Sequence, residues 1–203
     1  MLDVREALAE VDTIRGQIAR CLQFRGYGPV TVGTTGVLAF AVAGAQAVWA
    51  PRAEQLANAY LALWIATAAV ALTLILIETL ARARRIHSGF APEMIRSALE
   101  QFLPPIVAGV LLTVVLLRCA PEALWMLPGL WQMLFSLGVF ASCRLLPRAV
   151  FWVGVWYLAT GMLCLALGHG AWAFSPWEMG VPFGVGQLLV AVSLQFGYQQ
   201  TDA

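Results

Sequence analysis

The chain has 203 residues, of which 61% are hydrophobic and 11% are charged, and its formal net charge is +1. Soluble domains contain about 45–50% apolar and about 25% charged residues, so a fold of this composition needs lipid as a solvent. The small net charge excludes nucleic-acid binding through bulk charge, and we expect no direct nucleic-acid binding. The composition predicts an integral membrane protein, with the bilayer as its main partner.

The first segment, residues 1–25, has the pattern of a cytoplasmic amphipathic helix and lacks the apolar centre of a signal peptide. Its apolar residues recur at steps of three and four and form one stripe. Such a helix can lie on the membrane, pair with a copy of itself, dock a partner or pack on its own bundle. The candidate docking residues for a cytoplasmic protein partner are Leu8, Val11, Ile14 and Ile18.

Residues 26–203 contain six apolar segments, most of them near the length that crosses the hydrocarbon of a bilayer. We expect spans at about 29–50, 56–80, 104–118, 122–143, 148–168 and 176–198. The third is the shortest, and an amphipathic helix that begins near Pro92 is expected to continue into it past Pro104 and Pro105 with a kink. The predicted fold class is therefore an all-α integral membrane protein with six transmembrane helices.

Arginine supplies all twelve basic residues, and its distribution predicts the orientation. With both termini in the cytoplasm, Arg52 and Arg118 are external and the other ten arginines are cytoplasmic, which agrees with the positive-inside rule. The same orientation places four tryptophans at the outer interface: Trp49, Trp125, Trp172 and Trp177. We expect a multi-pass protein of a bacterial inner membrane.

Glu78 is the carboxylate that could lie within a span, and an ionisable residue at membrane depth is a functional candidate. It precedes Arg82 by four residues, so an ion pair at the cytoplasmic end is the alternative. Arg84 and Arg85, at the start of the following loop, are further docking candidates. Ser175-Pro176-Trp177-Glu178 has the spacing of a capping box at the start of the sixth span.

Polar residues within the spans define the intramembrane candidates. Gln132 and Gln187 each lie about ten or eleven residues from the same predicted face of the membrane, so we place both near the midplane. They either bond across helices as structural contacts or line a small cavity between spans 1, 4 and 6. The complete set of candidates is Thr34, Gln46, Glu78, Trp131, Gln132 and Gln187.

The loop before the sixth span contains His169, Trp172 and Trp177, which are candidates for an external ligand or pH-sensing site. A solvated loop histidine is the alternative. Cys119 and Cys164 are both expected near the outer face, where they either pair or remain inert thiols. The cysteines lack metal-site spacing, and no catalytic or phosphate-loop motif is present, so we expect no metal, no cofactor and no enzymatic activity.

The chain resembles an uncharacterised family of small six-helix bacterial inner-membrane proteins. The resemblance lies in four stretches that cover most of the chain: FRGYGP, RARRIHSGFAPEMIRSALEQFLP, LWMLPGLWQMLFSLGVFASCRLLPR and SPWEMGVPFGVGQLL. It implies no assigned activity and no functional residue, but it does imply that the protein is encoded beside a small winged-helix regulator.

Two functions from different classes follow. The first is a membrane-embedded sensor or regulator that holds a cytoplasmic partner, such as a winged-helix regulator, and binds a small apolar ligand. The alternative is a subunit of a small-molecule or ion transporter or channel, assembled as a homo-oligomer, with a polar path between spans 1, 4 and 6.

Overall fold

The structure is a computed structural model, and it describes residues 28–49, 57–85, 91–143, 149–168 and 172–199. Within these ranges it is all-α. The helices are α2 (Pro29–Trp49), α3 (Ala57–Arg85), α4 (Ala91–Cys119), the 3₁₀ helix η2 (Pro121–Met126), α5 (Leu127–Ser142), α6 (Val150–Leu167) and α7 (Pro176–Gln199). The leader helix expected at residues 1–25 lies outside the described residues.

Six helical segments are long and apolar enough to cross a membrane, in agreement with the six expected spans. They are Pro29–Val48, Ala57–Ala81, Glu100–Cys119, Pro121–Ser142, Val150–Leu167 and Pro176–Phe196. The expected continuation of the preceding helix into the third span is confirmed, because α4 runs without a break from Ala91 to Cys119 with Pro104 and Pro105 inside it, and the kink stays a prediction. Each proline removes one N–H from the helix, and a continuous helix tolerates this where neighbouring groups compensate.

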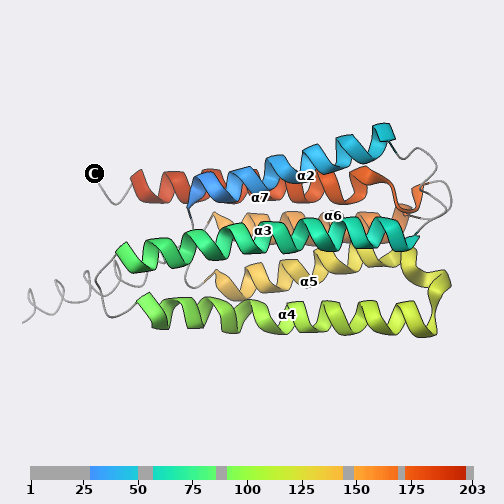
Figure 1. Cartoon of the computed structure of the whole chain (residues 1–203), viewed down its shortest axis with the longest axis horizontal. Coiled ribbons are helices and arrows are strands. Elements are labelled where there is room, and N and C mark those ends of the chain that lie inside the picture. The colour runs from blue at the N-terminus through green and yellow to red at the C-terminus, as the bar shows by residue number, and fades with distance from the viewer. Residues whose placement is uncertain (1–27, 50–56, 86–90, 144–148, 169–171, 200–203) are drawn as a thin grey trace, which may run out of the picture.

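Successive helices run in opposite directions, so their ends collect at two ends of the bundle (Figure 1). We call one the η2 end, because it contains η2 together with the last turns of α2, α4 and α6 and the first turns of α3 and α7. We call the other the Gly28 end, because α2 begins there, just after Gly28. The η2 end is on the right in Figure 1 and corresponds to the face that the sequence predicts to be external.

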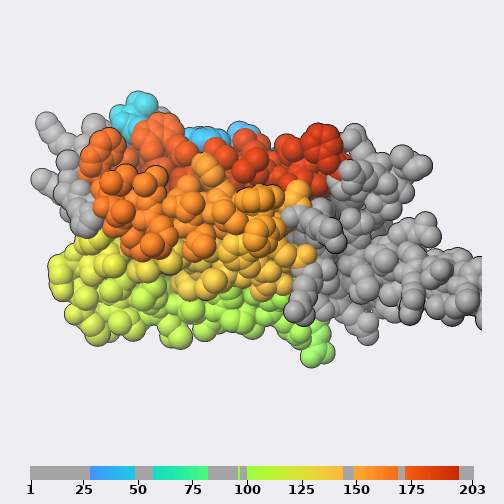
Figure 2. Space-filling model, turned by 180° about the vertical axis from the view of Figure 1, so that it is seen from behind, coloured from blue at the N-terminus to red at the C-terminus, as the bar shows by residue number. Residues whose placement is uncertain are grey.

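The two views of the bundle place α3 and α6 on opposite sides. In Figure 1, α2 and α7 form the upper edge, α4 forms the lower edge, and α3 crosses in front of α6. From behind, α6 covers the middle of the surface between α7 and α5, and α3 is hidden (Figure 2). The most extensive helix contacts are between α2 and α7 and between α5 and α6, whereas α3 meets α4 at few points.

Small residues bring α2 and α7 together along a line that we call the α2–α7 seam (Gly36, Phe40, Ala43, Gly180 and Gly184). A Cβ added at Gly36 would lie 2.8 Å from the carbonyl oxygen of Gly184. A Cβ at Gly180 would collide with Ala43, and one at Gly184 would collide with the ring of Phe40. The close approach that Gly180-x-x-x-Gly184 predicts is therefore present, and it gives van der Waals contact without a hydrophobic driving force.

The helices α5 and α6 approach each other through a reciprocal pair of glycines. A Cβ at Gly129 would lie 2.7 Å from the carbonyl oxygen of Gly161, and one at Gly161 would lie 2.8 Å from the carbonyl oxygen of Gly129. Because the opposing atoms belong to the backbone, neither helix can yield by rotating a side chain. This contact fixes the spacing of α5 and α6 near the η2 end.

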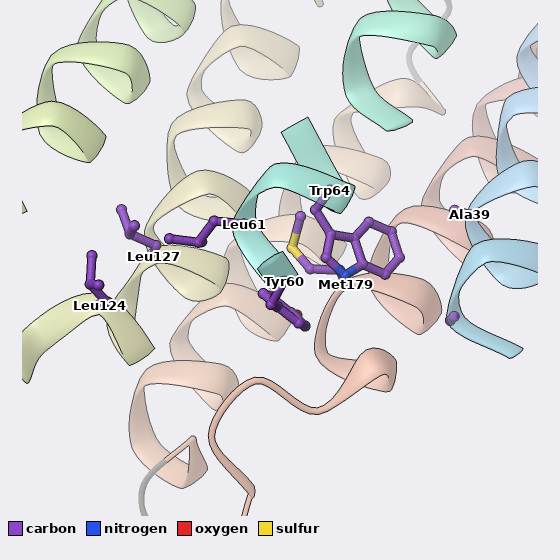
Figure 3. Close-up of a cluster of buried hydrophobic side chains, with 8 residues drawn as sticks. Ala39, Tyr60, Leu61, Trp64, Leu124, Leu127 and Met179 are labelled. Carbon is purple, nitrogen blue, oxygen red and sulfur yellow. The ribbon is translucent and has the colours of Figure 1, made fainter. Parts of the chain in front are cut away.

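A hydrophobic cluster fills the bundle toward the η2 end. It consists of Ala39, Ala43, Tyr60, Leu61, Trp64, Leu124, Leu127 and Met179, drawn from α2, α3, η2, α5 and α7. In Figure 3, Leu61 points toward Leu124 and Leu127, and the indole of Trp64 points toward α2. The first two turns of α3 thus contact α2 through Trp64, and η2 and α5 through Leu61.

The outer faces of α3 and α4 are apolar and exposed. Ile77 is 59% exposed on α3, and Leu111 is 60% exposed on α4. Side chains of this kind are stable in contact with lipid acyl chains. These faces are consistent with six helices crossing a bilayer.

Candidate functional site at the η2 end

The site is organised by a proline inside the last helix. Pro182 lies within α7 and has no backbone N–H, so the carbonyl oxygen of Glu178, four residues earlier, loses its helical hydrogen-bond donor. Gln132 of α5 replaces that donor, because its Nε2 donates to the Glu178 carbonyl oxygen at 2.8 Å. Gln132 is fully buried, so the bond is shielded from water and lipid alike.

Cys164 of α6 completes a three-helix contact around the same carbonyl. Its Sγ lies 3.5 Å from Gln132 Nε2 and donates to the Glu178 carbonyl oxygen at 3.7 Å. Cys119 and Cys164 are both free thiols, and Cys119 is exposed, so the disulfide that the sequence left open is not formed. Cys164 instead acts as a weak hydrogen-bonding group beside the proline.

The link between α6 and α7 is held by α3. The Tyr60 hydroxyl donates to the carbonyl oxygen of Ser175 at 3.2 Å, and the Tyr60 ring packs edge-on against Phe174 with 5.4 Å between ring centroids. Phe174 has a φ of 62°, a left-handed conformation that is uncommon for a bulky aromatic residue and that surrounding contacts must maintain. Tyr60 provides two of those contacts.

The first turn of α7 is capped by Glu178, but not in the way that the sequence predicts. The capping box required the Glu178 carboxylate to accept from the N–H of Ser175. The carboxylate accepts instead from the backbone N–H of Phe174, one residue earlier. The N–H of Ser175 is not available to the carboxylate, because it donates to the carbonyl oxygen of Trp172 at 3.1 Å.

Two side-chain oxygen atoms at this site are buried without a hydrogen-bond partner: Gln132 Oε1 and Glu178 Oε2. An unpaired buried acceptor costs about 1–3 kcal/mol. The amide of Gln132 cannot be turned over to solve this, because Oε1 would then face the Glu178 carbonyl oxygen. We define the polar cluster as Tyr60, Gln132, Cys164 and Glu178, and the two unpaired oxygens make it able to bind a hydrogen-bond donor.

Gln132 and Gln187 do not lie at one level, so their predicted common depth is wrong. Gln132 bonds to Glu178, and Gln187 lies nine residues further along α7, which is about 13 Å. The prediction counted residues from the start of each span, and equal counts give equal depths only where both spans begin at the same level. The fourth and sixth spans begin at different levels, because η2 extends beyond the start of α7 (Figure 1).

An aromatic group separates the levels of the two glutamines. The ring centroids of Phe135, Tyr157 and Phe183 are 4.8–5.5 Å apart, and Phe183 lies between Glu178 and Gln187 along α7. Gln187 lies close to the Tyr157 hydroxyl, which is buried and makes no hydrogen bond of good geometry. No bond joins the two amides.

Two other intramembrane candidates, Gln46 and Trp131, each take part in a hydrogen bond that a tryptophan indole donates across helices. The Oε1 atom of Gln46 accepts from Trp64 Nε1 at 3.2 Å, which ties α2 to α3. Trp131 Nε1 donates to the hydroxyl of Thr113 at 3.0 Å, which ties α5 to α4. Both contacts lie in or beside the hydrophobic cluster, and each joins two helices.

The remaining intramembrane candidates lie away from the polar cluster. Thr34 is exposed on α2, and its hydroxyl donates to the Val30 carbonyl of the same helix at 2.9 Å. The Glu78 carboxylate lies at the Gly28 end, where a Cβ added to Gly28 would collide with it. Neither residue takes part in the site at the η2 end.

Several candidates cannot be placed in the site. His169 and the stripe Leu8, Val11, Ile14 and Ile18 lie outside the described residues. Arg84 and Arg85 end α3, and their side chains are not among those described. Trp172 and Trp177 are 70% and 49% exposed at the η2 end, as residues at a membrane interface would be.

The chemistry of the cluster is that of a small polar site. Among the residues described, no group of three or more His, Cys, Asp and Glu side chains is placed to hold a metal ion. The cluster offers one carboxyl group, one amide oxygen, one hydroxyl and one thiol, at a helix start where the dipole favours negative charge. Such a set can hold a proton or a small donor.

Comparison of the chain with family models, with curated proteins and with solved structures finds no match. The family resemblance drawn from the four sequence stretches therefore stays a prediction. The fold and the site define the protein as an all-α chain with six helices long and apolar enough to cross a membrane.

Proposed function

We propose that this chain is a membrane-embedded sensor without enzymatic activity, located in a bacterial inner membrane with both termini in the cytoplasm. In this proposal the polar cluster at the external η2 end receives the stimulus. The cytoplasmic segments at the Gly28 end hold a protein partner, such as a winged-helix regulator. The polar side chains of the cluster favour a polar stimulus over the apolar ligand that the sequence led us to expect.

The observation that carries the proposal is the α2–α7 seam. Glu178 lies in the first turn of α7, and α7 packs on α2 through contacts of Gly36 with the Gly184 carbonyl, of Gly180 with Ala43 and of Gly184 with the ring of Phe40. Closely packed helices move as a unit rather than by side-chain adjustment, because there is little side chain between them to adjust. A shift of the first turn of α7 is therefore expected to reach α2.

The far end of α2 is where the signal would leave the membrane. The carbonyl of Gly28 accepts the Val32 N–H at 3.1 Å, so α2 begins there, and the Glu78 carboxylate lies against Gly28. A negative charge is favourable at a helix start because of the helix dipole. The leader, with its predicted docking stripe, directly precedes this point in the sequence.

The proposal is tested by capture of cytoplasmic proteins from membranes that contain the full chain, the Glu178→Gln variant, the Glu122→Gln variant or a chain without residues 1–25. Glu122 is the matched control, because it is an exposed carboxylate at the same end. We expect loss of the partner without residues 1–25 and altered capture with Glu178→Gln alone. Identical sets of captured proteins from all four membranes would refute the sensor.

The transporter alternative has less support. Its polar path between spans 1, 4 and 6 would need free polar groups, but the hydroxyls of Thr35 and Ser136 donate to carbonyls of their own helices. Phe183, whose ring packs on Phe135, lies between Glu178 and Gln187 along α7. Proteoliposome flux that disappears on Gln132→Leu would restore this alternative. Flux unchanged by Gln132→Leu, Gln187→Leu and Glu78→Gln together would remove it.

A further inference from the structure

We infer that the carboxyl group of Glu178 binds and releases a proton that it shares with the amide oxygen of Gln132. This inference deepens the proposed function and rests on it only in naming the proton as the stimulus. The site itself is argued from hydrogen bonding alone.

The starting point is the pair of buried oxygens without partners, Gln132 Oε1 and Glu178 Oε2. Both are acceptors when the carboxyl group is ionised, and two buried acceptors cannot satisfy one another. A carboxylic acid, in contrast, has one O–H donor. A proton on Oε2 therefore gives Glu178 a donor. Gln132 already bonds to the backbone carbonyl of Glu178, and its unpaired Oε1 is the acceptor that we assign to this donor.

The neighbouring donors cannot do the same, because each is already engaged. Gln132 Nε2 and the Cys164 thiol both donate to the Glu178 carbonyl. The Tyr60 hydroxyl donates to Ser175, and the Phe174 N–H donates to the Glu178 carboxyl group. A donor for the two unpaired oxygens must therefore come from outside the polar cluster.

The surroundings hold no described cation that would take the place of the proton. The titratable groups that interact with Glu178 are Tyr60 on α3 and Cys164 on α6, and both are neutral acids in their ordinary forms. From α5 the facing group is the neutral amide of Gln132. On the α2 side, Gly180 in the second turn of α7 faces Ala43, which is apolar.

Protonation has a mechanical consequence at the proline. The bound proton forms an O–H bond at Oε2 and comes from water, to which Glu178 is partly exposed. The protonated carboxyl group then adds a second link between α7 and α5, beside the bond from Gln132 to the Glu178 carbonyl. Release of the proton removes that link and leaves two buried acceptors, so rising pH loosens the first turn of α7.

The direct test is carbodiimide labelling, since a carbodiimide modifies protonated carboxyl groups. The full chain in lipid nanodiscs is treated over a pH series, with and without Na⁺, and the modification of Glu178 and Glu122 is measured by mass spectrometry. We expect Glu178 to be modified with a pH midpoint that Gln132→Leu moves down by about 1 unit, because the protonated form loses its acceptor. The midpoint of Glu122 should not move.

Two further measurements can refute the inference even if the Gln132→Leu variant does not fold. Glu178→Gln imitates the protonated form. Because the thiolate is the reactive species, alkylation of every cysteine rises with pH, so the rate at Cys164 is divided by the rate at exposed Cys119. We expect this ratio to rise more steeply with pH in the original chain than in Glu178→Gln. The same pH dependence of the ratio in both chains, or Glu178 that is never modified, overturns the inference. Protection of Glu178 by Na⁺ also overturns it and assigns the site to a metal cation.

The outcomes separate this inference from the proposed function. A proton site with a pH midpoint, combined with partner capture that does not respond to Glu178→Gln, upholds the site and refutes the sensor. Partner capture that responds to Glu178→Gln, combined with a carboxyl group that shows no exchangeable proton, upholds the sensor and refutes the proton as its stimulus.

Discussion

The two ends of the bundle hold their polar side chains in different ways. Toward the η2 end, hydrogen bonds cross between helices, as from Gln132 to Glu178 and from Tyr60 to Ser175. Toward the Gly28 end, the described hydroxyls of Thr79 and Ser142 donate to carbonyls of their own helices. A bond within one helix does not resist the separation of two helices. These described bonds therefore link helices to one another at the η2 end, whereas those of Thr79 and Ser142 do not.

The largest expected effect is a difference in stability between a substitution in the packed core and one on the lipid-facing surface of the same helix. Leu127 is completely buried in the hydrophobic cluster, whereas Leu137 on the same helix is 55% exposed. Leu127→Ala should lower the free energy of unfolding by about 2 kcal/mol or more, because it leaves a cavity. Leu137→Ala should have little effect, because lipid fills the space. Unfolding in mixed micelles measures both, and equal losses would contradict the assigned core.

The next effect concerns helix spacing. Gly129→Ala should destabilise the fold by about 1–3 kcal/mol, because the new methyl group meets the Gly161 carbonyl and the two backbones must separate. Gly44→Ala is the matched control, since a Cβ there meets nothing within 4 Å. The control should be neutral or slightly stabilising, because alanine favours a helix over glycine. A melting temperature that falls equally in both variants would argue against the α5–α6 contact.

The role of the proline is tested by a double-mutant cycle. Gln132→Leu should cost about 1–3 kcal/mol, because it leaves the Glu178 carbonyl with only the weak thiol donor of Cys164. In a Pro182→Ala background the restored N–H can donate to that carbonyl, so Gln132→Leu should cost less. The coupling energy between positions 132 and 182 is the quantity measured. Strict additivity would show that Gln132 does not compensate for the proline.

The smallest effect is expected at the Gly28 end. Arg96 and Glu100 form an ion pair at 2.7 Å within α4, but their side chains are 80% and 61% exposed. Exposed pairs at this spacing contribute about 0.3–0.5 kcal/mol. Arg96→Ala should therefore change the free energy of unfolding by no more than this amount, measured in the same micelles. A loss as large as that of Gln132→Leu would remove the contrast between the two ends.

The spans were predictable from the sequence because their signal is local. Length and hydropathy decide whether a segment can cross lipid, and Pro104 and Pro105 could be placed inside α4 because the apolar pattern continues through them. The close approach at Gly180 and Gly184 follows from their spacing on one helix face.

The site was not predictable in the same way, because it depends on how helices rotate and shift against one another. The sequence indicates Gln132 as a candidate that either bonds to Gln187 or lines a cavity with it, and it indicates Glu178 only as a capping residue. One signal was present in the sequence: Pro182 lies four residues after Glu178 and must leave that carbonyl without its helical donor. The position of Pro182 therefore identifies the carbonyl that needs a hydrogen-bond donor. Only the tertiary structure identifies the side chain that provides this donor.

The bond from Tyr60 to Ser175 joins residues that are 115 positions apart, and this separation bears on the order in which the protein is made. The chain emerges from the ribosome from its N-terminus, so α3 can enter the membrane long before α7 exists. Until α7 has been synthesised, Tyr60 has no Ser175 to bond, Gln132 has no Glu178 to contact, and Phe174 is not held in its left-handed turn. A nascent chain that ends after the fifth span would contain Tyr60, Gln132 and Cys164 but neither Glu178 nor the carbonyl groups to which they bond, so the function proposed for the cluster begins only with the last helix.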